Sequence, residues 1–98
     1  MTNYALLLKS FLDSDGKLKQ FPAKRKMKII TLFYLAEKIE KGRNYTEQEI
    51  NEILLRWHTF RDPATLRREM YDYHLLDRTR DGRTYQKSDP QPEMETLL

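Results

Sequence analysis

Two helical patterns follow each other in this sequence with only a few residues between them. The first begins at Thr46, which has the spacing of a capping box with Glu49. The second begins at Asp62, an N-cap residue followed by Pro63 at the first helical position. Apolar residues three and four apart predict that both helices are amphipathic: Ile50, Ile53, Leu54 and Trp57 in the first, and Leu66, Met70 and Tyr73 in the second. Two helices joined by so short a turn indicate a helix-turn-helix.

The segments before and after these two helices complete the order of elements found in a winged helix. Residues 75–87 read as a hairpin around Asp81-Gly82, a pair that favours the turn matching strand twist, and this hairpin would be the wing. Residues 23–41 have a helical pattern stopped by Gly42, and Asn44-Tyr45 reads as a short extended link. We therefore expect an α+β, mostly helical, winged-helix-like fold.

Two smaller elements are expected near the N-terminus. One is an amphipathic helix whose apolar stripe consists of Tyr4, Leu7, Leu8 and Phe11. The other is a short strand at Lys17–Phe21, where polar and apolar residues alternate until Pro22. The helical stripe either packs on the main body or forms a dimer contact.

Composition limits the remaining possibilities. The 98 residues suit one domain, and 34% of them are charged. The absence of cysteine excludes disulfides and thiolate metal sites, and no apolar run approaches the ~20 residues that span a bilayer. We expect a cytoplasmic protein with no membrane partner, made of one domain over residues 1–87 and a disordered acidic tail over residues 88–98.

Several motifs occur in the order typical of one bacterial family. They are Phe11-Leu12-Asp13, Phe21-Pro22, Tyr45-Thr46-Glu47, Leu66-Arg67-Arg68-Glu69, and Leu75-Leu76-Asp77-Arg78-Thr79 with Asp81-Gly82. From about Leu6 to Gln86 the chain resembles the family known as domain of unknown function 2087. Members of that family occur alone or behind an ArsR-like helix-turn-helix, so the resemblance implies a regulatory context and leaves the activity open.

The second helix of the helix-turn-helix carries the first candidate site residues. Arg67, Arg68 and Tyr71 lie outside its apolar stripe, where a winged helix offers side chains to the major groove. The alternative is a solvated face, with Arg68 paired to Asp72 and one of the two arginines anchoring the turn or wing.

Two further groups of cations could meet phosphates. The predicted wing holds Arg78, Arg80 and Arg83, although surface hairpins also use charge for solubility. Lys24, Arg25 and Lys26 belong to six basic residues with no acid between Asp15 and Glu37. All 18 basic residues but only 12 of the 15 acids lie in residues 1–87, which gives this part a net charge of +6.

These patterns favour a binding protein over an enzyme. No nucleophile–base order, glycine-rich phosphate loop or paired carboxylates is present, and two histidines 16 residues apart match no metal motif, so we expect no catalytic residues, metal or cofactor. We expect a nucleic-acid-binding module, with duplex DNA as partner and a role in transcription regulation. The alternative is a protein-interaction or dimerisation module of a regulator, which docks an acidic protein or a second copy.

Overall fold

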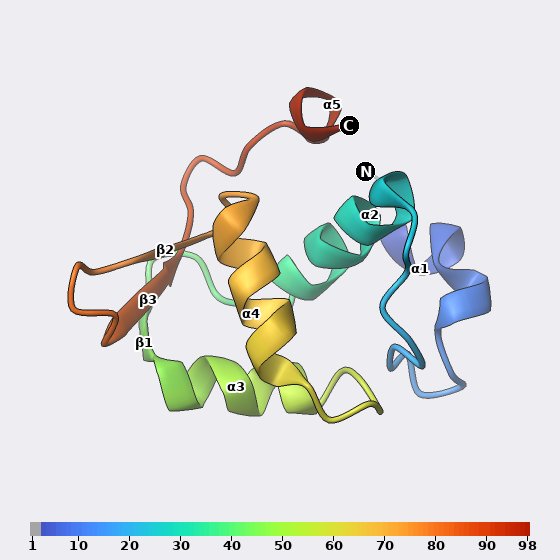
Figure 1. Ribbon diagram of the computed structural model, residues 1–98, viewed down its shortest axis with the longest axis horizontal. Coiled ribbons are helices and arrows are strands. Elements are labelled where there is room, and N and C mark those ends of the chain that lie inside the picture. Colours follow the sequence, from blue (N-terminus) through green and yellow to red (C-terminus); the bar gives the residue numbers. More distant parts are fainter. Residues whose placement is uncertain (1–2) are drawn as a thin grey trace.

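The structure is a computed structural model that describes residues 3–98. Within this range the chain is α+β, with five α-helices, one 3₁₀ turn and a three-stranded antiparallel sheet (Figure 1). In chain order the elements are α1 (Tyr4–Leu7), the 3₁₀ turn (Lys9–Phe11), α2 (Arg25–Ala36), β1 (Asn44–Thr46), α3 (Glu47–Leu55), α4 (Pro63–Asp72), β2 (Leu76–Arg78), β3 (Thr84–Lys87) and α5 (Met94–Leu97).

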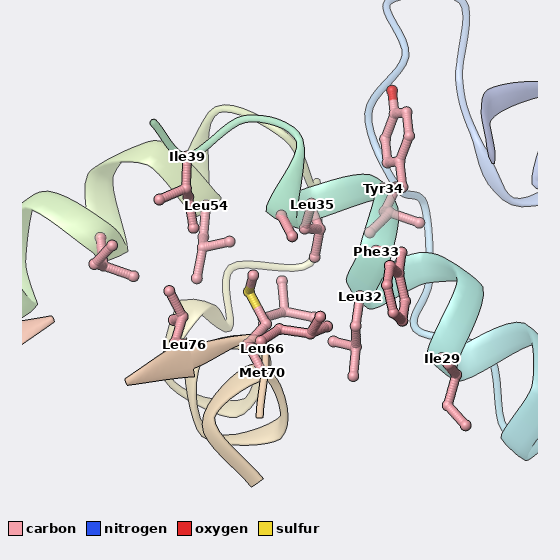
Figure 2. Packing of buried hydrophobic residues seen from close by; sticks show 14 of the residues in the cluster. Ile29, Leu32, Phe33, Tyr34, Leu35, Ile39, Leu54, Leu66, Met70 and Leu76 are labelled. Atoms are coloured by element: carbon pink, nitrogen blue, oxygen red, sulfur yellow. The ribbon is translucent and has the colours of Figure 1, made fainter. Parts of the chain in front are cut away.

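Helix α2 forms the centre of the hydrophobic core. The eight consecutive residues from Ile29 to Ala36 are all buried, because other elements cover the helix on several sides. Figure 2 shows Leu32 and Leu35 of α2 facing Leu66 and Met70 of α4. The sequence predicted a longer helix over residues 23–41, but after Ala36 the chain continues in tight turns.

The predicted N-terminal caps of α3 and α4 are confirmed. Thr46 and Glu49 form the reciprocal capping box at the start of α3, and the Asp62 carboxylate accepts from the backbone N–H of Thr65 at the start of α4. The inner faces are the predicted ones: Ile50 and Leu54 of α3 and Leu66 and Met70 of α4 are fully buried.

The sheet brings together strands that are distant in sequence. Strands β2 and β3 form the predicted hairpin, and β1 joins it on the other side of β3, which gives the order β1-β3-β2. Tyr45 of β1 lies opposite Tyr85 of β3, and both side chains are buried. The link expected at residues 44–45 is therefore an edge strand of the sheet that contains the hairpin.

The N-terminal segment differs from expectation in two respects. The expected single helix is split into α1 and the 3₁₀ turn, so Leu8 is fully buried while Leu7 is 52% exposed. The expected strand at Lys17–Phe21 is reduced to isolated bridges of Leu18 with Leu12 and His58, because Leu18 pairs with two neighbours over one residue only.

The C-terminal segment packs on the body, in contrast to the expected disordered tail. Ser88 is buried, α5 contacts α2, and Met94 and Leu97 lie against the core. The two apolar side chains of this short helix give the segment something to bury, which its overall acidic composition did not indicate.

Candidate nucleic-acid interface

His58 and Asp62 position α4 relative to α3. The His58 ring is buried, with its Nδ1 2.6 Å from the carbonyl oxygen of Leu54 and its Nε2 accepting from the backbone N–H of Asp62 at 2.9 Å. These contacts fit a ring that carries its hydrogen on Nδ1. The histidine that follows the core tryptophan therefore links the end of α3 to the N-cap of α4.

The outward side of α4 is exposed between two other parts of the fold. In Figure 1 the helix lies between the hairpin and α2, and it contacts both. With Leu66 and Met70 turned inward, Arg68 and Asp72 point to solvent and line a hollow of about 230 Å³ with Thr65 and Glu69. The predicted Arg68–Asp72 ion pair is not formed within residues 3–98.

Arg67, which the sequence placed on the outward side of α4, instead lies largely inside the fold. Its side chain is only 12% exposed, and its Nη2 lies 3.3 Å from a carboxylate oxygen of Glu47. Its Nη1 donates to the Asn51 side chain, and its guanidinium lies over the Tyr85 ring. Arg67 thus joins α3, α4 and β3. This agrees with the alternative in which one of the two arginines, Arg67 or Arg68, has a structural role.

Tyr71 and Arg78 join α4 to the β2-β3 hairpin. The Arg78 guanidinium lies 4.2 Å from the centre of the Tyr71 ring, a cation–π distance. Contacts with Tyr85 and then Tyr71 raise the pKa of Arg78 above its ordinary value. Arg78 is otherwise exposed, so the β2-β3 hairpin presents one cation held in a defined place.

The tip of the β2-β3 hairpin presents two more cations. Arg80 and Arg83 are exposed, and Arg83 is 3.9 Å from Asp81. The Asp81 carboxylate accepts from the Thr79 hydroxyl at 2.6 Å and from the Arg83 backbone N–H at 3.0 Å, and these bonds lower its pKa. Asp81 thus orders the turn, which leaves Arg80 as an exposed tip residue.

The basic cluster predicted at the start of α2 contains both exposed side chains and side chains that contact other parts of the fold. Lys24 and Lys26 are exposed, whereas Lys28 lies 3.6 Å from Glu69 of α4. Arg25 donates two hydrogen bonds to the carbonyl oxygen of Leu97, at 3.0 and 2.8 Å. Arg25 therefore holds the C-terminal segment, although it remains an exposed residue.

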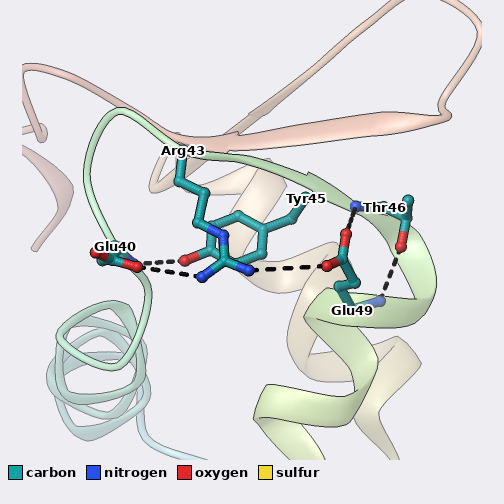
Figure 3. Close-up of polar contacts among 5 residues, drawn as sticks. All are labelled: Glu40, Arg43, Tyr45, Thr46 and Glu49. Atoms are coloured by element: carbon teal, nitrogen blue, oxygen red, sulfur yellow. Dashed lines mark hydrogen bonds and ion pairs between the residues drawn. The ribbon is translucent and has the colours of Figure 1, made fainter.

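A second polar site, not predicted as a site from the sequence, lies where β1 meets α3. Figure 3 shows Arg43 between Glu40, at 3.2 Å, and Glu49, at 3.9 Å, with its guanidinium over the Tyr45 ring. Hydrogen bonds from Thr46, and then the charge of Arg43, lower the pKa of Glu49. The capping box already indicated Thr46 and Glu49, and the i, i+3 spacing of Glu40 and Arg43 was a signal for the other part of this cluster.

This cluster borders a hollow of about 310 Å³ that is not basic. Its lining contains three cations and three acids: Lys38, Arg43 and Arg56 against Glu40, Glu49 and Glu52. The hollow therefore suits a polyanion less well than the surface between α2 and the β2-β3 hairpin.

Two features are absent from the described part of the chain: a cluster of potential metal ligands and a helix long enough to span a membrane. Among residues 3–98 no group of three or more His, Cys, Asp or Glu side chains could hold a metal ion. None of the helices there has the length and apolar character needed to cross a membrane.

Comparison with known proteins decides the family. The model of a family of uncharacterized proteins conserved in bacteria, domain of unknown function 2087, matches residues 17–87. The chain belongs to this family. The match confirms the resemblance drawn from the motifs, although it begins after the Leu6–Gly16 part of that resemblance. In this family member, the matched region includes all of α2, α3, α4 and the sheet. No curated protein and no solved structure matches the chain.

Proposed function

We propose that this protein is a winged-helix module that binds duplex DNA and acts in transcription regulation in the bacterial cytoplasm. The element order from α2 to β3 and the strand order β1-β3-β2 support a winged helix, with α4 as recognition helix and β2-β3 as wing. Fold alone does not assign function, so the surface carries the proposal.

The observation that carries it is the position of α4 between two groups of exposed cations. Lys24 and Lys26 lie at the start of α2, and Arg78, Arg80 and Arg83 lie on the wing. Contacts link the elements that carry these groups to α4: Lys28 of α2 with Glu69 on one side, and Arg78 of β2 with Tyr71 on the other. A helix in the major groove has phosphates on both sides, and this arrangement of charge suits them.

The test is fluorescence anisotropy of a labelled random duplex, and separately of single-stranded RNA, from low to physiological salt. Five phosphate contacts predict that log affinity falls with log salt at a slope of roughly −4 to −5 for the duplex. Removing two wing charges, as R80A/R83A, should lower that slope by about 2 and weaken binding equally for all sequences.

A matched control removes two exposed cations elsewhere. The variant K9A/R56A has the same change in net charge, at the 3₁₀ turn and at the end of α3. It should bind nearly as wild type does. An equal loss of duplex affinity in the two variants, or no duplex binding even at low salt, would refute the proposal. Tighter binding to the single-stranded RNA than to the duplex would make RNA the partner in place of DNA.

One observation favours the alternative of a dimerisation module. Leu6 and Leu7 of α1 are 66% and 52% exposed, and adjacent exposed leucines are a candidate contact for a second copy. Sedimentation of wild type and L6S/L7S would test it: a dimer that becomes monomeric in the variant, in a protein without duplex affinity, favours this function.

A further inference from the structure

The side chains of α4 fall into two classes according to their contacts. On its flanks the long polar side chains are engaged within the fold: Arg67 with Glu47 at 3.3 Å, Glu69 with Lys28 at 3.6 Å, and Tyr71 beneath Arg78 at 4.2 Å. These residues position the helix and are not available to read a ligand.

Arg68 and Asp72 are different. Both are exposed, and within residues 3–98 neither makes a side-chain hydrogen bond or ion pair. Asp72 lines two hollows, the one of about 230 Å³ with Arg68 and another of about 430 Å³ with Tyr71 and Arg78. Arg68, which can only donate hydrogen bonds, and Asp72, which can only accept them, thus lie one helical turn apart on the exposed side of α4.

An exposed carboxylate there opposes simple binding to phosphates. On a surface between two groups of cations, Asp72 lowers the attraction for the DNA backbone, because like charges repel. In the major groove, however, a carboxylate accepts a hydrogen bond from the N4 amino group of cytosine, while arginine donates to O6 and N7 of guanine. Arg68 and Asp72 therefore have complementary partners among base edges.

We infer that Arg68 and Asp72 read base pairs in the major groove, with Arg68 on a guanine and Asp72 on a cytosine. One turn of helix rises roughly 5.4 Å, which corresponds to one or two base steps of about 3.4 Å. The preferred site therefore contains the guanine and the cytosine within two base pairs of each other. This inference rests on the proposed function and assigns its sequence preference.

The experiment is selection from a randomised duplex library with the full chain, comparing wild type, R68A and D72N. Wild type should select a site with both bases, each favoured about tenfold over the alternatives. R68A should lose the guanine preference alone. D72N should change cytosine to adenine at one position, because an amide side chain pairs with adenine, and should bind random duplex more tightly because one negative charge is removed.

R80A is the control, because it removes an exposed arginine from the wing tip. It should weaken binding to all sequences and leave the selected site unchanged. Since all three changed residues are exposed, the variants should keep the wild-type melting temperature within a few degrees.

The outcomes separate this inference from the function on which it rests. A wild-type protein that binds duplex with a strong salt dependence but selects no site, or a D72N variant that selects the wild-type site, overturns the assignment and leaves DNA binding intact. Absence of duplex binding in the anisotropy titration overturns both.

Discussion

Arg67 and Arg68 are adjacent in sequence, yet replacement by alanine should affect stability very differently. Arg67→Ala removes a charge-assisted hydrogen bond to Asn51, worth ~1.5–3 kcal/mol, and an ion pair to the half-exposed Glu47, worth up to ~1 kcal/mol. The buried stem adds ~2 kcal/mol, at about 0.8 kcal/mol per methylene. Against these losses, the buried Arg67 Nε has no partner among residues 3–98, and its removal returns ~1–3 kcal/mol.

The net cost of Arg67→Ala is therefore roughly 2 to 3 kcal/mol in the free energy of unfolding. For a chain of this size that lowers the melting temperature by roughly 10 to 20 °C. Arg68→Ala, at an exposed position, should change the free energy by no more than ~0.5 kcal/mol. Urea unfolding followed by circular dichroism, supported by thermal melts, measures both variants.

A third variant tests the mechanism. Arg67→Met keeps most of the buried stem and removes the unpartnered Nε, so it should cost about 1 kcal/mol or less. If Arg67→Ala is no more destabilising than Arg68→Ala, or if the methionine variant costs as much as the alanine variant, the assigned role of Arg67 is refuted.

Three further predictions concern other contacts. Arg25→Ala should release the C-terminal segment from its Leu97 contact, so amide exchange in residues 94–98 should accelerate while exchange in the core stays unchanged. Gly16→Ala should destabilise by about 1–2 kcal/mol in urea unfolding, because Gly16 has φ +79° and a Cβ there would lie 3.1 Å from the Tyr34 hydroxyl; an unchanged midpoint would contradict this. The pKa of Asp62 is lowered in the fold, first by its hydrogen bonds from Thr65, so the stabilisation from this cap is present above the unfolded pKa and is lost as pH falls through the folded value. Wild type and Asp62→Ala should therefore differ in urea midpoint near neutral pH, and the difference should shrink as the solution is made acidic.

The elements of the fold that depend on chain neighbours were predictable from the sequence. The capping box of Thr46 and Glu49, the Asp62 cap and the turn at Asp81-Gly82 each involve groups within a few residues of one another. Such contacts form wherever the local backbone is right, and the apolar spacing then indicates which side of each helix faces the core.

The candidate site was predicted only in part, because periodicity gives no information on the neighbour beside a helix. Arg67 lies on the flank of α4, at roughly 100° from the outward direction of Arg68, where a side chain is exposed or buried according to what packs there. The structure places α3 and β3 there, and Arg67 becomes internal. Arg25 is similar, because its partner Leu97 lies 72 residues away.

The sequence by itself therefore determined helices α3 and α4 with their inner faces, the β2-β3 hairpin and the surplus of positive charge. The tertiary structure alone decided that β1 joins the hairpin, that α5 packs on α2, and which cations of the basic groups face solvent. The physical reason is the range of the interactions: caps, turns and periodicity act within one or two helical turns, whereas burial of a charged flank depends on elements brought together from the whole chain.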